Sequence, residues 1–122
     1  MFYERHIRTQ AVYDNLVTIC WFMEIWMFLI FIKYTVPLET ILLHVESHRA
    51  YLQKFFDSKH LICSGPLVPR TGGVILSCHS NRQLVDEFIK GDPFYSHQLA
   101  AYDIIEFEPV KYAEECAVFI EQ

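Results

Sequence analysis

The sequence predicts a single α+β domain in which strands and helices follow one another in the order β-α-β-β-α-β. The length of 122 residues suits one domain. Apolar runs of strand length, rich in Ile and Phe, alternate with segments in which apolar residues return every three or four positions. With 52% apolar and 16% aromatic residues, the chain can bury a substantial core, although an exposed sheet face would still need a partner.

The first strand and the first helix are clearly marked. The continuous apolar run at 28–35 is typical of a central strand, and it stops at Val36-Pro37. Pro37 fits the first turn of a helix, where its missing N–H costs nothing, and we expect one helix over 38–58. One apolar stripe at helical spacing supports this helix: Leu38, Ile41, Leu42, Val45, Leu52, Phe55 and Phe56.

Turn-forming residues divide the rest of the domain. The loop at 66–72 is rich in Pro and Gly and should join two strands as a hairpin. Asn81 is the expected N-cap of one helix, and Asp92-Pro93 marks the beginning of another, with Asp as the cap and Pro at the first helical position. The expected elements are strand 61–65, strand 73–78, helix 81–90, a short helix ending near 99, and strand 102–108.

This order of elements is the ferredoxin-like pattern, with helices on one face of a four-stranded antiparallel sheet. Two helical regions cannot cover both faces of such a sheet. The uncovered face should therefore be buried against something, and a two-fold related copy of the chain is the commonest solution. We accordingly expect a homodimer.

The two ends of the chain differ from the domain between them. We expect the domain to span residues 27–111, with an N-terminal extension at 1–26 that need not belong to the native domain and a C-terminal tail at 112–122. Residues 16–32 are strongly apolar, but Glu24 lies among them, and a carboxylate is costly in lipid. We therefore expect no membrane association; the alternatives for the extension are an additional helix packed on the domain or a weak membrane anchor.

Charge and cysteine usage narrow the class of protein. The net charge is −5 and the basic residues are scattered, so we expect no nucleic-acid partner, because phosphate binding needs clustered positive charge. The four cysteines form no CxxC pair and have no metal-finger spacing, and no signal peptide is apparent. A reduced, cytoplasmic protein is the simplest interpretation.

Two stretches carry a family resemblance. They are HVESHRAYLQKFFDSKHLICSGPLVPRTGGVIL and GDPFYSHQLAAYDIIEFEP. Their shared features are His48, Asp57 nine residues later, Ser64-Gly65-Pro66 at a strand end, and Asp92-Pro93-Phe94 before the short helix. Over about residues 27–111 the chain resembles the YciI-related (YCII domain) proteins of the dimeric α/β-barrel superfamily.

This resemblance implies a dimeric α/β-barrel-like assembly with a pocket between helix and sheet, and a His–Asp active site. Some relatives remove chloride from chlorinated aromatic diols. The wider superfamily includes lactone isomerases and monooxygenases that use no cofactor. By this resemblance we expect a small-molecule ligand and no cofactor.

His48 is the strongest catalytic candidate, because imidazole titrates near neutrality and the residue lies on the flank of the apolar stripe. Asp57 could orient it in the manner of a triad carboxylate. A nine-residue step is half a turn out of phase, however, so the two would meet only if the helix ended or bent before Asp57. Asp92 is the rival carboxylate. The structural alternatives are a partly buried histidine, a solvated helix end and a helix N-cap.

Three further residues are candidates for substrate binding. Ser64 and Gly65 lie at a strand end, where a ligand can approach the backbone closely and Ser64 could donate a hydrogen bond. Arg70, in the hairpin loop, could bind a carboxylate or phenolate, and Asp92 completes the set. An ordinary turn and a solvated loop charge are the alternatives. His44 and His48 are four residues apart on one helix, but no third ligand is evident and we expect no metal.

Two functions follow from these residues. The first is a small cofactor-independent enzyme that performs general acid/base chemistry (elimination, isomerisation or hydrolysis) on a small cyclic or aromatic substrate. The second is a non-catalytic dimer that binds a metabolite or a protein partner. A cavity that holds His48 within hydrogen-bonding reach of a carboxylate favours the enzyme. A His48 packed in apolar surroundings without a cavity favours the binding module.

Overall fold

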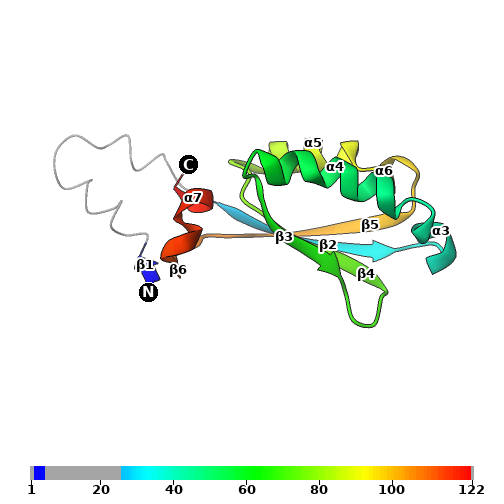
Figure 1. The fold of residues 1–122 in the computed structure, drawn as a ribbon, viewed down its shortest axis with the longest axis horizontal. Coiled ribbons are helices and arrows are strands. Elements are labelled where there is room, and N and C mark those ends of the chain that lie inside the picture. Colours follow the sequence, from blue (N-terminus) through cyan, green and yellow to red (C-terminus); the bar gives the residue numbers. More distant parts are fainter. Residues whose placement is uncertain (1, 5–25, 122) are drawn as a thin grey trace.

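A computed structural model describes residues 2–4 and 26–121. Helices lie along one face of a four-stranded antiparallel sheet, as the ferredoxin-like pattern predicts (Figure 1). The strand order is β3-β4-β2-β5, so the first strand of the domain is central and the hairpin strand β3 is at an edge. The strands are β2 (Met27–Tyr34), β3 (Leu61–Pro66), β4 (Gly72–Ser77) and β5 (Ala100–Phe107).

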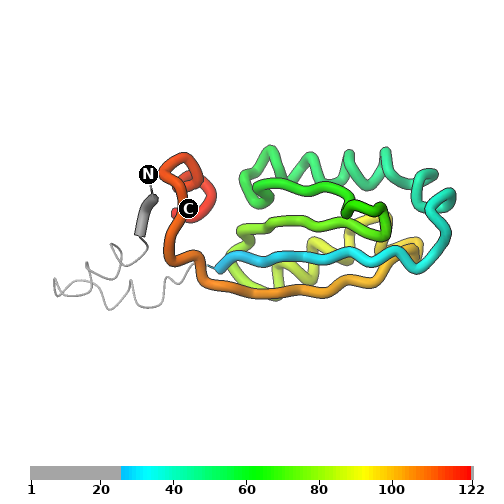
Figure 2. Tube along the Cα trace, turned by 90° about the horizontal axis from the view of Figure 1, so that it is seen from below, coloured from blue at the N-terminus to red at the C-terminus, as the bar shows by residue number. Residues whose placement is uncertain are grey.

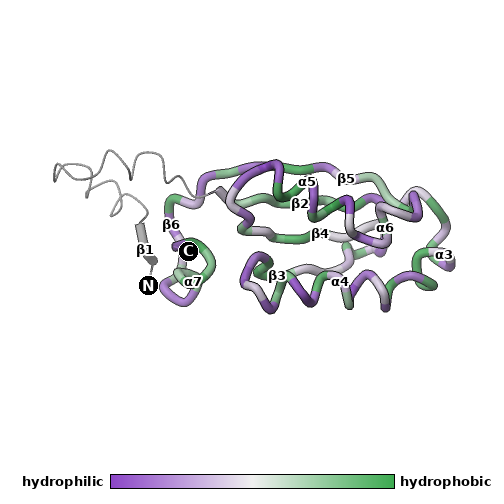
Figure 3. Tube along the Cα trace, turned by 90° about the horizontal axis from the view of Figure 1, so that it is seen from above, coloured by the Kyte–Doolittle hydropathy of each residue, from purple (hydrophilic) through white to green (hydrophobic). Residues whose placement is uncertain are grey.

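The alternation of side chains on β2 builds the core. Phe28, Ile30 and Ile32 are buried on the helix-facing side, and Phe28 pairs with Ser77 of β4 and with Glu106 of β5. Successive strand residues point to opposite faces, so this register sends every second residue of β2 into one apolar cluster with the helices. Figure 3 shows the hydrophobic colouring concentrated along β2 and β4, as expected for the inner strands.

The predicted continuous helix over 38–58 is wrong in one respect. It is divided into α3 (Leu38–Leu42) and α4 (Val45–Asp57), with a turn at residues 43–44. The turn arises at His44, whose backbone N–H donates to Ile41 O rather than to Thr40 O. The Thr40 carbonyl oxygen instead accepts from Leu43 N at 3.2 Å, and the His44 ring nitrogen Nδ1 lies 3.2 Å from the same oxygen.

The remaining helices of the domain begin at the two N-cap residues that the sequence predicts, Asn81 and Asp92. Asn81 accepts a hydrogen bond from Leu84 N at 2.9 Å and begins α5 (Arg82–Gly91). Asp92 accepts one from Phe94 N at 3.1 Å and begins α6 (Pro93–Ser96). Both caps satisfy backbone N–H groups that a helix leaves unpaired at its first turn.

Among the described residues, no helix covers the other face of the sheet. Leu29 and Phe31 of β2 are only partly buried, and Ile105 and Phe107 of β5 are 47% and 39% exposed. These four residues, which we call the open sheet face, alternate with the core residues of the same strands. The open sheet face is therefore apolar and accessible to solvent, and an uncovered face of this kind is the reason why the sequence predicts a dimer.

The C-terminal tail folds back on the end of the domain. It forms β6 (Lys111–Ala113), a 3-10 turn η2 (Glu114–Cys116) and α7 (Ala117–Ile120), beyond the end of the sheet where β2 begins (Figure 2). A second, smaller apolar cluster fixes it there, with buried members Met27, Cys78, Tyr112 and Ile120.

The N-terminal segment is described only in part. Residues 2–4 form β1 (Phe2–Glu4), which pairs antiparallel with β6. Residues 5–25 lie outside the described part of the chain, and with them lies most of the predicted extension and of the apolar run at 16–32. Residues 27–32 of that run belong to β2. Within the described residues, no helix has the length and apolarity needed to cross a membrane.

Candidate active site

A histidine and a buried aspartate meet beneath α4. His48 Nδ1 lies 2.7 Å from Asp92 Oδ1, with side-chain exposures of 12% and 1%. Asp92 has two further donors: Phe94 N reaches the same oxygen at 3.1 Å, and the Tyr102 hydroxyl donates to Oδ2 at 2.7 Å. Burying a carboxylate is costly unless its oxygens are paired, and these three donors supply the pairing.

The turn between α5 and α6 positions Asp92 from the local sequence. A residue before proline is driven to extended backbone, and Asp92, before Pro93, has φ −71° and ψ 129°. Gly91 precedes it, and a Cβ at this position would overlap the Tyr51 hydroxyl, which itself donates to Phe88 O at 2.7 Å. The absence of a side chain at Gly91 therefore lets α4 and α5 pack closely just before the aspartate.

His48 is held so that one ring nitrogen remains for a ligand. An ionised carboxylate only accepts hydrogen bonds, so His48 Nδ1 carries a hydrogen and donates it in the bond to Asp92. In a neutral ring the lone pair is then on Nε2. The ring also stacks on Phe94, with centroids 4.0 Å apart and planes 5° from parallel. These two contacts fix the tautomer and the plane of the imidazole.

His48 lines a cavity between α4 and the sheet. The cavity has a volume of about 130 Å³. Cavities on the order of 150 Å³ take up a benzene-sized guest. The walls are apolar residues from α4, β2, β4 and α6, together with a small polar set. The polar or cationic side chains among the lining residues are Tyr34, His48, Arg49, Ser64 and Arg70.

The residues predicted from sequence fall into two groups. Ser64, Gly65 and Arg70 line the cavity together with His48, although they come from a strand end and a loop more than a dozen residues away along the chain. Asp92 is not part of the lining, because it lies behind the His48 ring, where His48, Phe94 N and the Tyr102 hydroxyl occupy its oxygens. Its contact with a ligand would therefore pass through His48.

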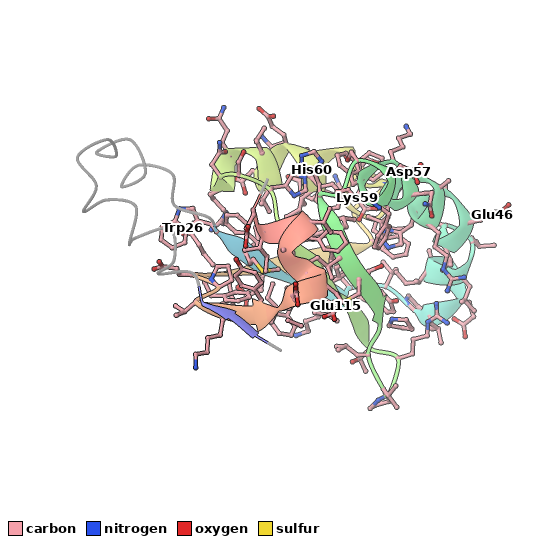
Figure 4. All side chains as sticks on the ribbon, turned by 60° about the vertical axis from the view of Figure 1, so that its left-hand side comes forward. Trp26, Glu46, Asp57, Lys59, His60 and Glu115 are labelled. Carbon is pink, nitrogen blue, oxygen red and sulfur yellow. The ribbon has the colours of Figure 1, made fainter. Side chains whose placement is uncertain are left out.

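The structure does not pair Asp57 with His48. Asp57 is an exposed residue at the last position of α4, and its carboxylate accepts a hydrogen bond from Gln53 Nε2 at 2.8 Å. Figure 4 shows it beside Lys59 and His60, whereas Glu46, two residues from His48, marks the beginning of the same helix. Helix α4 continues without a bend to Asp57, so the half-turn difference in phase keeps the two apart.

Tyr102 is the site residue that the sequence analysis missed. It lies on β5 among the core-facing residues, and burial, with the charge of Asp92 next in importance, raises the pKa of its hydroxyl well above the ordinary value. The hydroxyl therefore keeps its proton and remains a donor to the carboxylate. Strand alternation could have placed Tyr102 on the helix-facing side, but nothing in the sequence indicated that its hydroxyl would reach Asp92.

His44 is engaged elsewhere. Its ring lies 4.6 Å from the His97 ring, and its Nδ1 is next to Thr40 O. Over residues 2–4 and 26–121, no group of three or more His, Cys, Asp and Glu side chains is arranged to hold a metal ion. His44 is absent from the cavity lining and makes its contacts on α3 and after α6.

Together the fold and the site define a class: a small ferredoxin-like α+β domain that presents a carboxylate-bound histidine to a cavity of about one ring. Residues 27–108 match the YCII-related domain, and the chain belongs to this family. A comparison with curated protein sequences gives no match.

A solved structure has the same fold. It is that of 5-chloro-2-hydroxyhydroquinone dehydrochlorinase (TftG) from Burkholderia phenoliruptrix AC1100, in complex with 2,5-dihydroxybenzoquinone. The two proteins are 23% identical with a TM-score of 0.57, and the match covers 67% of this chain and 91% of that chain. At this identity the similarity establishes the fold of the domain.

Proposed function

We propose that this protein is a small enzyme that needs no cofactor and moves a proton on a small cyclic or aromatic substrate. The observation that carries the proposal is the pairing of His48 Nδ1 with buried Asp92 beside a ring-sized cavity. His48 Nε2 is the general base or acid, and Asp92 orients the ring and stabilises its protonated form. Asp57, first considered for this role, is replaced by Asp92 in the proposal.

Elimination and isomerisation both fit this arrangement. In an elimination, Nε2 takes a proton from the substrate, the bonding electron pair forms a new double bond, and the leaving group departs as an anion. In an isomerisation, the same nitrogen removes a proton at one carbon and returns it at another. Neither step changes the oxidation state of the protein or requires a second reactant, so His48 and Asp92 suffice for the proton transfers.

The TftG complex supports a ring substrate. Its name describes a dehydrochlorinase, and its bound molecule is a dihydroxylated quinone. A single six-membered ring is also the size that a cavity of about 130 Å³ accommodates. We therefore infer hydroxylated or acidic single-ring compounds as the first substrates to test.

The experiment compares His48→Gln with His97→Gln, the same substitution at an exposed histidine outside the cavity. Purified wild type is incubated with 5-chloro-2-hydroxyhydroquinone and with small lactones, and chloride release and ultraviolet spectra are followed. General base catalysis is worth roughly 10²–10⁴-fold, so His48→Gln should lose at least a hundredfold while His97→Gln keeps the wild-type rate. Wild type that binds these rings without converting any of them would instead support the non-catalytic binding module.

We further propose that the protein acts as a homodimer joined through the open sheet face. The apolar residues Ile105 and Phe107 would then be buried between two copies. Light scattering after size exclusion should give twice the chain mass for wild type and the single mass for Ile105→Glu. Val118→Glu, exposed on α7, is the matched control and should remain dimeric. A monomeric wild type would contradict the dimer.

A cytoplasmic location stays a prediction. Cys63 and Cys116 are free thiols in the structure, which agrees with a reducing compartment. Fractionation of cells that express the tagged chain would test it.

A further inference from the structure

One buried cationic atom at the cavity lacks a hydrogen-bond acceptor. Arg70 is partly buried and lines the cavity, and its Nε is inaccessible to solvent without a partner among the described residues. A guanidinium is always charged and presents its N–H groups in a planar fork. Leaving a buried charged donor unpaired costs free energy, so the described residues leave the hydrogen-bonding capacity of the Arg70 guanidinium partly unused.

The permanently charged side chains that line the cavity are both cationic. They are Arg49 and Arg70, and among the described residues no Asp or Glu joins the lining; the nearest carboxylate, Asp92, lies behind the His48 ring. Neither arginine forms an ion pair within the described part of the chain, whereas Arg82, outside the cavity, pairs with Asp86 at 3.2 Å. These two positive charges lie together in a protein whose net charge is −5, so the cavity differs in sign from the protein as a whole. Positive charge in a cavity with apolar walls attracts anions.

Backbone hydrogen bonds hold the Arg70 loop in place. Leu67 N donates to Gly72 O at 2.8 Å, Thr71 N to Pro69 O at 2.8 Å, and Tyr34 N to Thr71 O at 3.1 Å. The last of these ties the loop to β2, whose residues also line the cavity. Because the loop is already ordered, little conformational entropy is lost when Arg70 binds a ligand.

We propose that the cavity contains an oxyanion subsite in which Arg70, assisted by Arg49, binds the charged group of an acidic ring compound while His48 faces its reacting atom. The ligand class is a small planar ring that carries a carboxylate or an ionised enol or phenol. This proposal rests on the proposed function for the role of His48, but the subsite itself depends only on Arg70 and Arg49. Planar oxyanions match the guanidinium fork, and such charge-assisted bonds are about twice as strong as neutral ones.

The test uses pairs of ligands that differ in charge and not in size. Binding of benzoate and benzamide, and of 2-furoate and 2-furamide, is measured by calorimetry, together with 2,5-dihydroxybenzoquinone as an acidic quinone. Each acid should bind wild type at least about tenfold more tightly than its amide, because a hydrogen bond to a charged group is worth roughly 1.5–3 kcal/mol. Raising the salt concentration should weaken the binding of the acids and leave the binding of the amides unchanged.

Variants locate the subsite. Arg70→Gln should remove most of the preference for acids, Arg70→Lys should restore only part of it because an ammonium lacks the fork, and Arg49→Gln should have a smaller effect. Arg82→Gln is the control and should behave as wild type. Equal binding of acid and amide, no effect of Arg70→Gln, or no binding of any acid to wild type would each overturn the subsite.

The subsite and the proposed catalysis fail in different ways. His48→Gln should retain the preference for acids while it loses turnover. If that variant keeps both turnover and the preference, the catalytic proposal is wrong and the subsite stands. If it loses turnover while wild type does not distinguish acids from amides, His48 keeps its role and the oxyanion subsite is wrong.

Discussion

His48 and His79 both place Nδ1 next to a buried side-chain oxygen, yet only His48 has a carboxylate as its partner and lines a cavity. His48 Nδ1 is 2.7 Å from the Asp92 carboxylate, and its ring lines the cavity. His79, just beyond β4, is 4% exposed and lies 2.5 Å from the Ser77 hydroxyl, among the rings of Phe88 and other aromatic residues. Its Nε2 is buried with no partner among the described residues.

The partner atom accounts for the difference. A carboxylate stabilises a proton on the imidazole, whereas a hydroxyl provides no charge to balance one. Burial, and next the neighbouring His60, lower the pKa of His79 to about 4, so this ring is neutral at physiological pH. Burial beside a second imidazole therefore keeps His79 neutral, whereas the proposed acid/base role of His48 depends on the buried carboxylate beside it.

Among the predicted substitutions, removal of the Asp92 carboxylate should lower the stability of the fold most. Asp92→Ala leaves the His48 N–H, the Tyr102 hydroxyl and the first turn of α6 without their acceptor. Each buried donor that loses its acceptor costs about 1–3 kcal/mol, so we expect the free energy of unfolding to fall by about 3–5 kcal/mol in total. Urea unfolding monitored by circular dichroism measures it.

The matched control is Asp57→Ala, at the exposed end of α4. Its change should stay within about 0.5 kcal/mol, as for most surface substitutions. Asp92→Asn keeps the size and an N-capping oxygen but not the charge, so it should fold and lose activity on any substrate found for wild type. A loss of stability in Asp57→Ala equal to that in Asp92→Ala would mean that the pairing with Asp92 is not the dominant interaction.

The pH dependence of stability should come from His79. Its unfolded pKa is near 6.5 and its folded pKa about 4, so the unfolded chain binds a proton that the folded protein excludes. The stabilisation is fully present above pH 6.5 and declines as the pH falls toward 4, below which the folded protein is protonated as well. The difference between the two pKa values corresponds to at most about 3.5 kcal/mol of stability, since one pKa unit is about 1.4 kcal/mol.

His79→Gln removes this titration and should flatten the stability profile between pH 6.5 and 4. His97→Gln, at an exposed histidine, should leave the profile as it is in wild type. Equilibrium unfolding at several pH values in this interval provides the comparison. An unchanged slope in His79→Gln would show that another group causes the acid sensitivity.

Much of the fold could be predicted because local signals agreed with one another. The apolar run of β2, the hairpin glycines and the caps at Asn81 and Asp92 each depend on a few neighbouring residues. The break at His44 escaped prediction because it depends on a side chain that competes for the Thr40 carbonyl. The apolar stripe continues across that break, so periodicity alone could not reveal it.

The site was less predictable because its contacts join distant segments. His48, Ser64, Gly65 and Arg70 were identified as candidates, and they meet at the cavity. As the carboxylate partner of His48, the sequence favours Asp57, although the helical phase is against it. Nothing local in the sequence shows that Asp92 packs beneath His48. Asp92 is also a helix cap, as expected, and its Oδ1 accepts hydrogen bonds from both Phe94 N and His48 Nδ1.

The smallest predicted effect concerns the third donor. Tyr102→Phe keeps the ring and deletes the hydroxyl that donates to Asp92 Oδ2, so it should cost about 1 kcal/mol. Because Tyr102 and His48 share Asp92, a double-mutant cycle of Tyr102→Phe with His48→Gln should show a coupling energy of at least about 0.5 kcal/mol. Tyr102→Phe with His79→Gln shares no hydrogen-bond partner and should be additive. Urea unfolding of wild type, the three single variants and the two double variants measures both coupling energies. Additivity in the first cycle would mean that Asp92 does not join the tyrosine to the histidine.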